Sequence, residues 1–234
     1  MSFYDPIAEL YDPWSRGVVE DIGFYVAEAV AAGGPVVELG VGTGRIAIPT
    51  ALAGVPVIGV DSSERMLAVC RRRAEEAGVA ELLELRLGDL RRPPVAERVR
   101  LVTCPFRALL HLRSDEERLE VFAAVHALLE PGGRFVFDVF APSREDVAAT
   151  GGRWLEREPG IWERADWDVV TRQFTLSVRG RSGATRMALA WLPAAEWRAL
   201  LEQAGLEIAA CHGWFDRSPY AGGEDSVWIA RVPA

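Results

Sequence analysis

Short apolar runs alternate with amphipathic segments along the first 140 residues of the chain. The apolar runs have the length and the near-continuous hydrophobicity of strands buried on both faces, and they cover residues 36–40, 55–61, 82–87, 99–106 and 134–140. Helix-forming segments precede or follow them at residues 17–32, 45–53, 66–77 and 114–129. Ile22 and Val26 share one face of the first segment, Ser62 and Ser63 are N-cap candidates for the third, and Ser114 and Glu117 have the spacing of a capping box for the fourth. This alternation predicts a doubly wound α/β fold with a mostly parallel sheet.

The pattern changes in the second half of the chain. From residue 160 to residue 192, apolar and polar positions alternate with a period of two, which indicates half-buried antiparallel strands. One predicted face carries Val170, Phe174, Leu176 and Val178, and a later strand carries Met187, Leu189 and Trp191. We therefore predict a β-meander inserted into the parent fold.

A helix and two strands complete the predicted fold. Pro193 begins a helix whose apolar face includes Trp197 and Leu201, and Gly205 ends it. The runs LEIAACHGWF and SVWIARV then form an antiparallel hairpin at the sheet edge, which brings the sheet to seven strands. With 234 residues, 50% of them hydrophobic, the chain is large enough for one domain with a full core.

Three closely spaced glycines follow the first predicted strand, in the segment VVELGVGTG. Gly40 and Gly42 fit the dinucleotide fingerprint G-x-G-x-x-G, but its third glycine would fall at Arg45 and comes one residue early, at Gly44. Glu38 lies two residues before the first glycine, where its carboxylate would repel a pyrophosphate. The motif therefore favours a ligand with a cationic or hydrogen-bond-donating group, such as S-adenosylmethionine.

Polar or small residues also follow the other predicted strands. Asp61 ends the second strand, about 20 residues after the first glycine, where an acid can bind a ribose diol. Asp89 follows the third strand and can accept from an adenine amino group, while Met66 and Leu90 can enclose the ring. Because ligands of such sheets bind at the carboxyl ends of the strands, we expect these positions to share one cleft with the ends of the first and fourth strands. The remaining candidates for this cleft are Ser62, Cys104 and Phe106.

The chain resembles the class I S-adenosylmethionine-dependent methyltransferases, which have a Rossmann-like fold. The resemblance rests on VVELGVGTG, VIGVDSSERML, LGDL, LVTCPF and LLEPGGRFVFDVF, in family order and spacing. It implies that Gly40, Gly42 and Gly44 lie under the cofactor, that Asp61 binds the ribose, and that Asp89 and Leu90 lie at the adenine. Glu38 would act through the methionine end of the cofactor or through loop amides. We expect one domain, 1–234, with an N-terminal helical cap (1–34), a cofactor-binding half (35–140), the inserted meander (141–192) and the C-terminal helix and hairpin (193–234).

A narrower resemblance concerns the methyl acceptor. The segments FYDPIAELYDPWSRG and PFRALLHL are similar to small-molecule N-methyltransferases of the amino-sugar and glycine/sarcosine types. This similarity implies a small-molecule acceptor, with His111 and Tyr11 as catalytic residues and Arg16 on the cofactor carboxylate. An imidazole can serve as the general base for an amine, and a hydrogen-bonded structural role is the alternative for His111.

Composition argues against several other classes of function. The net charge is −8 and no basic stripe is present, so we expect no nucleic-acid partner. No run approaches the roughly 20 apolar residues of a membrane helix, and the acidic start MSFYDPIAELYDP is unlike a signal peptide. Three widely spaced cysteines fit the reducing cytoplasm. No histidine, cysteine and carboxylate cluster has metal-ligand spacing, so we expect no metal.

Two alternatives and one question of assembly stay open at this point. An NAD-linked dehydrogenase would use a similar glycine turn, but Arg45 and Glu38 argue against it. A non-catalytic methyltransferase-like binding subunit would keep the fold, but the intact set of acids and glycines argues against that too. Trp154, Trp162 and Trp167 could line an acceptor pocket or a homodimer contact.

Overall fold

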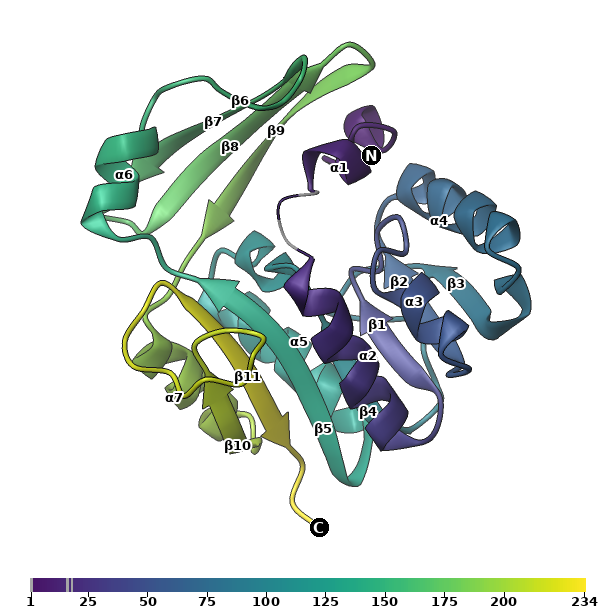
Figure 1. The fold of residues 1–234 in the computed structure, drawn as a ribbon. Helices are drawn as coiled ribbons and strands as arrows, with labels where there is room; N and C mark the ends of the chain where they lie inside the picture. Colours follow the sequence, from purple (N-terminus) through teal and green to yellow (C-terminus); the bar gives the residue numbers. More distant parts are fainter. Residues whose placement is uncertain (1, 16, 18) are drawn as a thin grey trace.

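A large sheet with helices on both faces carries a smaller sheet at one end, as Figure 1 shows. The structure is a computed structural model that describes residues 2–15, 17 and 19–234. The large sheet has seven strands in the order β10-β11-β5-β4-β1-β2-β3. Its strands are Val36–Leu39 (β1), Val57–Asp61 (β2), Leu83–Leu87 (β3), Val99–Cys104 (β4), Leu129–Phe140 (β5), Glu207–His212 (β10) and Asp225–Arg231 (β11).

The directions of the strands agree with the sequence pattern. Strands β1 to β5 pair in parallel, and β11 runs antiparallel to both β5 and β10. The central strands β1, β2 and β4 are buried almost completely, because helices cover both faces of the sheet. The predicted fold class, a mostly parallel seven-stranded sheet with a C-terminal hairpin and an inserted meander, is confirmed.

Two layers of helices cover the large sheet. In one layer, α2 packs on α3, and α3 packs on α4; in the other, α5 packs on α7. These helices are Glu20–Ala32 (α2), Ala47–Leu52 (α3), Glu64–Glu76 (α4), Asp115–Leu128 (α5) and Ala194–Gln203 (α7). Short 3-10 helices occur at Asp5–Ile7 (η1), Ala80–Leu82 (η2) and Ala108–His111 (η3).

Serine side chains cap two of these helices, as their sequence predicts. The hydroxyl of Ser63 accepts from the backbone N–H of Met66 at the start of α4, 3.1 Å away. The hydroxyl of Ser114 accepts from the N–H of Glu117 at the start of α5, at 3.3 Å. The Glu117 carboxylate accepts from the N–H of Arg113, so the cap forms at Ser114 as expected but the return bond of the capping box comes from the residue before it. These caps fix where α4 and α5 leave the ends of β2 and β4.

The smaller sheet is the inserted meander and has the order β6-β7-β8-β9. Its strands are Leu155–Glu158 (β6), Ile161–Asp168 (β7), Gln173–Gly180 (β8) and Gly183–Ala190 (β9), and the helix Arg144–Thr150 (α6) precedes them. The sequence pattern predicted neither α6 nor β6. Val170 was wrongly assigned to a strand: it lies in the turn between β7 and β8 and is 89% exposed, because Asp168 accepts from turn amides and ends β7 there.

An N-terminal arm, residues 2–15, lies between the smaller sheet and the cofactor-binding half (Figure 1). It contains η1 and the short helix Tyr11–Trp14 (α1). The apolar residues Ile7 and Leu10 are buried in the same core as the smaller sheet. The arm therefore belongs to the packed fold.

Candidate active site

A cavity of about 580 Å³ opens at the carboxyl ends of β1, β2, β3 and β4, and we call it the first cavity. The residues that line it come from the glycine loop, the strand ends, η3, the N-terminal arm and the smaller sheet. The predicted residues among them are Tyr11, Gly40, Gly42, Asp61, Ser62, Met66, Asp89, Leu90, Phe106 and His111. The structure thus brings most of the sequence candidates into one cleft.

The glycines of the loop after β1 have two different functions. Gly40 and Gly42 line the first cavity with φ values of 74° and 56°, so their backbone faces the cavity in a conformation that favours glycine. Gly44, with φ at 83°, does not line the cavity. A Cβ on Gly44 would lie 2.7 Å from the Cys70 sulfur and 2.9 Å from a methyl group of Ile48. Gly44 therefore lets the loop pack on α3 and α4.

Asp61 links the glycine loop to the start of α4. Its two carboxylate oxygens accept from the backbone N–H of Gly42, at 2.9 Å, and of Ser63, at 2.8 Å. The residue is 8% exposed, and burial raises its pKa, while the hydrogen bonds from the backbone oppose that shift. Each oxygen keeps a lone pair for a further donor, so the carboxylate can bind hydroxyl groups in the cavity.

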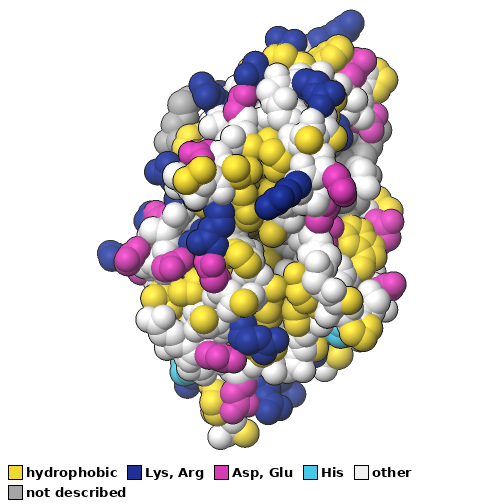
Figure 2. Space-filling model, turned by 90° about the vertical axis from the view of Figure 1, so that its left-hand side faces the viewer, with side chains coloured by type: hydrophobic (Ala, Val, Ile, Leu, Met, Phe, Trp, Pro, Cys, Tyr) yellow, Lys and Arg dark blue, Asp and Glu magenta, His cyan; other side chains and the backbone are white. Residues whose placement is uncertain are grey.

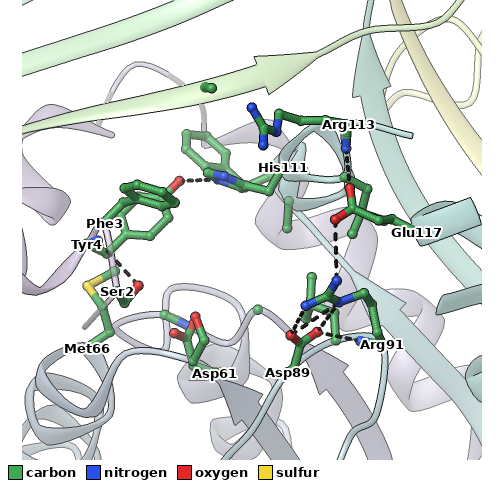
Figure 3. Close-up of a pocket in the computed structure, with 18 of the residues that line it drawn as sticks. Ser2, Phe3, Tyr4, Asp61, Met66, Asp89, Arg91, His111, Arg113 and Glu117 are labelled. Carbon is green, nitrogen blue, oxygen red and sulfur yellow. Dashed lines mark hydrogen bonds and ion pairs between the residues drawn. The ribbon is translucent and has the colours of Figure 1, made fainter. Parts of the chain in front are cut away.

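Asp89 pairs with Arg91, which also lines the first cavity. Figure 3 shows a chain of polar contacts from Asp89 through Arg91 to Glu117 and Arg113. The guanidinium of Arg91 lies 2.7 Å from Asp89 and 3.3 Å from Glu117. The hydrogen bond from Arg91 lowers the pKa of Asp89, so this carboxylate is ionised at neutral pH.

Two predicted residues lie beside the first cavity and do not line it. Glu38 is 2% exposed below the glycine loop, where burial raises its pKa to about 8 despite the positive charge of Arg45. A hydrogen bond from the backbone N–H of Ala47 partly offsets that shift. Cys104 is fully buried at the end of β4, and burial raises the pKa of its thiol. The predicted residue Arg16 lies outside the described residues.

Aromatic side chains from the arm meet the residues after β4. A hydrogen bond of 2.8 Å joins the hydroxyl of Tyr4 to Nε2 of His111 (Figure 3). Tyr11 lies edge-on to Tyr4, with ring centroids 5.6 Å apart, and to Phe106, with centroids 6.2 Å apart. Desolvation lowers the pKa of His111 to about 4, so its imidazole is neutral at physiological pH.

A second cavity, of about 480 Å³, lies between the large sheet and the smaller sheet. Its walls are mostly apolar, and two carboxylates, Asp146 and Glu163, and two arginines, Arg107 and Arg157, lie among them. The apolar and aromatic lining residues are Leu110, Phe140, Leu155, Ala165, Trp167, Phe174, Leu176, Met187 and Leu189. Figure 2 shows a hollow with hydrophobic side chains at mid-height of the molecule, flanked by arginine and acidic side chains. Of the three predicted tryptophans, only Trp167 lines this cavity.

Three side chains line both cavities: Tyr4, Phe106 and His111. They come from the arm and from the segment after β4, and because they line both spaces we call them the shared wall. A group transferred from one cavity to the other would pass at this wall.

The arm also ties the two cavities together through polar contacts. Asp12 accepts from the hydroxyl of Thr43 in the glycine loop, at 2.6 Å, and pairs with Arg73 at 2.7 Å. The indole N–H of Trp14 donates to Glu163 of β7, at 2.7 Å. The short stretch from Asp12 to Trp14 thus contacts both the glycine loop and a polar residue of the second cavity.

Comparisons with known proteins agree with this geometry. Residues 36–133 match the family model described as a methyltransferase domain. The structure of the CcbJ methyltransferase from Streptomyces caelestis superposes with a TM-score of 0.86 and 31% identity, over 100% of this chain and 99% of that one. The uncharacterized methyltransferase GWCH70_2477 of Geobacillus sp. (strain WCH70) is 30% identical over 182 residues, which cover 73% of this chain and 82% of the relative.

A further relative is the cypemycin N-terminal methyltransferase of Streptomyces sp, 27% identical over 80% of this chain and 78% of its own length. Another Geobacillus methyltransferase is 28% identical, and the chain spans only 53% of its length. The chain belongs to the S-adenosylmethionine-dependent methyltransferase family, which confirms the enzyme class and the cofactor predicted from the sequence.

The described part of the chain has neither a membrane-spanning helix nor a metal-binding cluster. No helix in residues 2–15, 17 and 19–234 is long and apolar enough to cross a membrane. Within the same residues, no group of three or more histidine, cysteine or acidic side chains could hold a metal ion.

Several residues at the site were not identified from the sequence. Arg91 pairs with Asp89, Glu163 lies in the second cavity, and Asp138 binds the backbone of the wall between the cavities. Asp138 stands near the carboxyl end of β5, so the rule that identified Asp61 and Asp89 could have found it. Glu163 carries no such signal, because it lies in the middle of a strand of the smaller sheet.

Proposed function

We propose that this protein transfers the methyl group of S-adenosylmethionine to a nitrogen atom of a small-molecule amine bound in the second cavity. The observation that carries the proposal is the shared wall: Tyr4, Phe106 and His111 line both cavities, so a cofactor in the first and an acceptor in the second would meet there. Exclusion of water at such a junction favours methyl transfer.

In this proposal the first cavity holds the cofactor. Gly40 and Gly42 let the cofactor approach the backbone, and Asp61 accepts from the ribose hydroxyls with its remaining lone pairs. Asp89 accepts from the adenine amino group, between Met66 and Leu90. Ser62 completes this side of the cavity, and Glu38 acts indirectly, because it supports the loop at Ala47.

When bound, the cofactor supplies a sulfonium methyl group, whose bond to sulfur breaks as the acceptor nitrogen attacks in line. The chain contributes by positioning the nitrogen about 3 to 3.5 Å from that carbon and by excluding water. Tyr11 and Phe106 are placed to do this, because they lie edge-on to one another in the first cavity.

His111 is proposed to orient the nitrogen rather than to store its proton. A base with a pKa of about 4 cannot hold the proton of an aliphatic amine, whose pKa resembles the roughly 10 of lysine. The amine therefore binds as the free base, and the positive charge moves from sulfur to nitrogen during transfer. The neutral imidazole, held by Tyr4, accepts or donates one hydrogen bond at the acceptor.

Two features support a nitrogen acceptor with an apolar body. The second cavity holds Asp146, whose carboxylate favours the cationic product of amine methylation, and Glu163, whose charge Arg157 already balances. The relative that acts at an N-terminus, the cypemycin methyltransferase, supports nitrogen independently.

The proposal extends to the surroundings of the reaction. Cys70 and Cys104 are buried free thiols, which supports a cytoplasmic location. The net charge of −8 disfavours nucleic acids as partners. We propose no membrane partner for this protein. Its assembly is proposed to be a homodimer, which light scattering would detect.

Calorimetry and product analysis test the proposed function. We expect S-adenosylmethionine and S-adenosylhomocysteine to bind and NAD to fail, because a dehydrogenase would bind NAD. With 13C-methyl S-adenosylmethionine, the product spectrum is then compared for benzylamine, benzyl alcohol and benzyl mercaptan, and next for larger aromatic amines. Methylation of alcohols or thiols but not amines would overturn the nitrogen assignment. Cofactor binding without any product from these acceptors or from cell extract would favour the binding subunit.

A further inference from the structure

Asp138 is a buried carboxylate that the proposed reaction does not use directly. It lies near the carboxyl end of β5 and is 6% exposed. Asp138 lines neither the first cavity nor the second. An ionisable group in such a place needs hydrogen-bond partners, and its partners indicate what it does.

The Asp138 carboxylate binds two successive backbone amides. One oxygen accepts from the N–H of Phe106, at 2.8 Å, and from the hydroxyl of Tyr25, at 2.6 Å. The other oxygen accepts from the N–H of Arg107, at 3.1 Å. The carboxylate therefore clamps the Phe106–Arg107 turn to β5.

That turn has a conformation that these residues do not favour on their own. Phe106 has φ at 57° and Arg107 has φ at 60°, both in the left-handed region that glycine prefers. Non-glycine residues persist there when the surrounding structure holds them. The hydrogen bonds that these two amides donate to Asp138 provide this restraint on the backbone itself.

The clamped turn determines the wall between the two cavities. Phe106 lines both cavities, and Arg107 lines the second one. Arg107 is also the residue before η3, the 3-10 helix that ends at His111, and no side chain caps that helix. A change in the turn would therefore move both Phe106 and His111.

We infer that Asp138 is a positioning residue of the methyl-transfer site, which fixes Phe106 and His111 through the backbone of the Phe106–Arg107 turn. The functional part of this inference rests on the proposed function, since it assumes that transfer occurs at the shared wall. The structural part, the clamp on two amides, is testable without an acceptor.

Titration of the carboxylate gives the clamp a pH dependence. Burial raises the pKa of Asp138 to about 6, although Tyr25 and Arg107 favour its ionised form. Above that pH it accepts from both amides, and below it the bound proton removes one acceptor site. The titratable or charged groups that act on it or on its partners are Tyr25 and Asp21 on α2, Arg45 after the glycine loop, Cys104 on β4, Arg107, and Asp225 on β11 through Arg107.

The first test measures hydrogen exchange of the Phe106 and Arg107 amides by NMR on the whole protein. Asp138→Asn keeps the shape but offers only one acceptor oxygen, so we expect exchange of at least one of the two amides to accelerate about tenfold or more. Tyr25→Phe is the matched control, because it removes the third contact and leaves both amide bonds, so protection should persist. Equal protection in wild type and Asp138→Asn would overturn the inference.

A measurement on the wild type covers the case in which Asp138→Asn does not fold. After correction for intrinsic rates, protection of these two amides should fall as pH is lowered from 7.5 to 5, while amides in β1 and β4 stay protected. Unchanged protection through pH 6 would contradict this titration, and exchange of both amides at pH 7.5 as fast as that of exposed loop amides would contradict the clamp.

A third experiment compares cofactor binding with catalytic turnover. In Asp138→Asn, the affinity for S-adenosylhomocysteine should stay within about threefold, while kcat for the amine found active falls about tenfold or more. Arg107→Gly in the same background removes the strain at φ 60° and should restore part of kcat. Loss of amide protection with unchanged kcat would refute the positioning role but leave methyl transfer intact. Absence of turnover in the wild type would instead count against the proposed function, and the exchange data would still decide the clamp.

Discussion

The two cavities of this protein are built in different ways. The first lies at the ends of adjacent parallel strands, and several of its residues stand at or just after those ends: Gly40, Asp61 and Asp89. The second is assembled from α1, η3, α6 and the smaller sheet, whose segments are far apart in the chain. If the proposed assignment of the cavities holds, cofactor recognition is a local property of the parent fold, and acceptor recognition depends on the inserted sheet and the arm. Substitutions in the two regions should accordingly separate cofactor affinity from acceptor turnover.

The largest expected effect is on cofactor binding, at the glycine that faces the first cavity. Gly42→Val places a branched side chain at a φ of 56° and into the first cavity. We expect the affinity for S-adenosylhomocysteine to fall by about a hundredfold or more, with the circular dichroism spectrum preserved. Normal calorimetric binding would show that the loop does not contact the cofactor.

The neighbouring glycine should respond in stability instead of affinity. In Gly44→Ala the new Cβ would meet Cys70 and Ile48 at 2.7 and 2.9 Å, at a φ of 83°. The overpacking and the backbone strain together should reduce the free energy of unfolding by about 3 kcal/mol. Denaturant melts measure this loss; a melt like that of the wild type, with weakened cofactor binding, would contradict the division of roles.

Asp61 should affect cofactor affinity without affecting the second cavity. Asp61→Ala removes the carboxylate that binds the ribose in our proposal, and a hydrogen bond to a charged group contributes roughly 1.5 to 3 kcal/mol. Calorimetry should therefore show a loss of affinity of roughly 10- to 150-fold for S-adenosylhomocysteine. Asp61→Asn keeps the bond from one backbone amide and should lose less. An unchanged affinity in the folded alanine variant would exclude the ribose contact.

His111 belongs to both cavities and should affect turnover alone. Because its pKa is lowered to about 4, the imidazole is neutral throughout the range from pH 5.5 to 8, and no titration of His111 should be visible there. An inflection near pH 6 in the dependence of kcat on pH would come from the titration of Asp138. It should therefore persist in His111→Ala and disappear in Asp138→Asn. Loss of one neutral hydrogen bond should lower kcat by about tenfold.

Two results would change that interpretation of His111. A rate loss of several orders of magnitude, or an inflection near pH 6.5 that His111→Ala removes, would restore the general-base role expected from the sequence. Tyr4→Phe is the matched variant, because it removes the hydrogen bond to His111 and keeps the ring.

The smallest effect is expected at the link between the arm and the second cavity. Trp14→Phe removes the 2.7 Å hydrogen bond to Glu163, whose side chain is 16% exposed and keeps Arg157 as its partner. We expect the KM for the amine to rise about threefold, since a neutral donor is lost and an ion pair stays. Cofactor affinity serves as the internal control and should not change. A loss of affinity for both the cofactor and the amine would contradict a separate effect of Trp14 on the second cavity.

The sequence alone determined the sheet, its helices and most of the first cavity. Strand ends and helix caps are local features, because a period of apolar residues and the first polar residue after it are visible in a short window. That is why Asp61, Asp89 and the cap at Ser63 could be identified in advance. The buried face of α2 was less visible: the expected residues Ile22 and Val26 are only partly buried.

Only the tertiary structure decided which side chains meet across long distances. Tyr4 and His111 are separated by 107 residues, and Trp14 and Glu163 by 149. It also decided which way a side chain faces at a predicted strand end, so Glu38 supports the loop from below instead of lining the cavity. Such contacts follow from how whole elements pack, and no short window of sequence contains both partners. The physical reason is that periodicity specifies a residue's face on its own element, whereas packing specifies which other element covers that face.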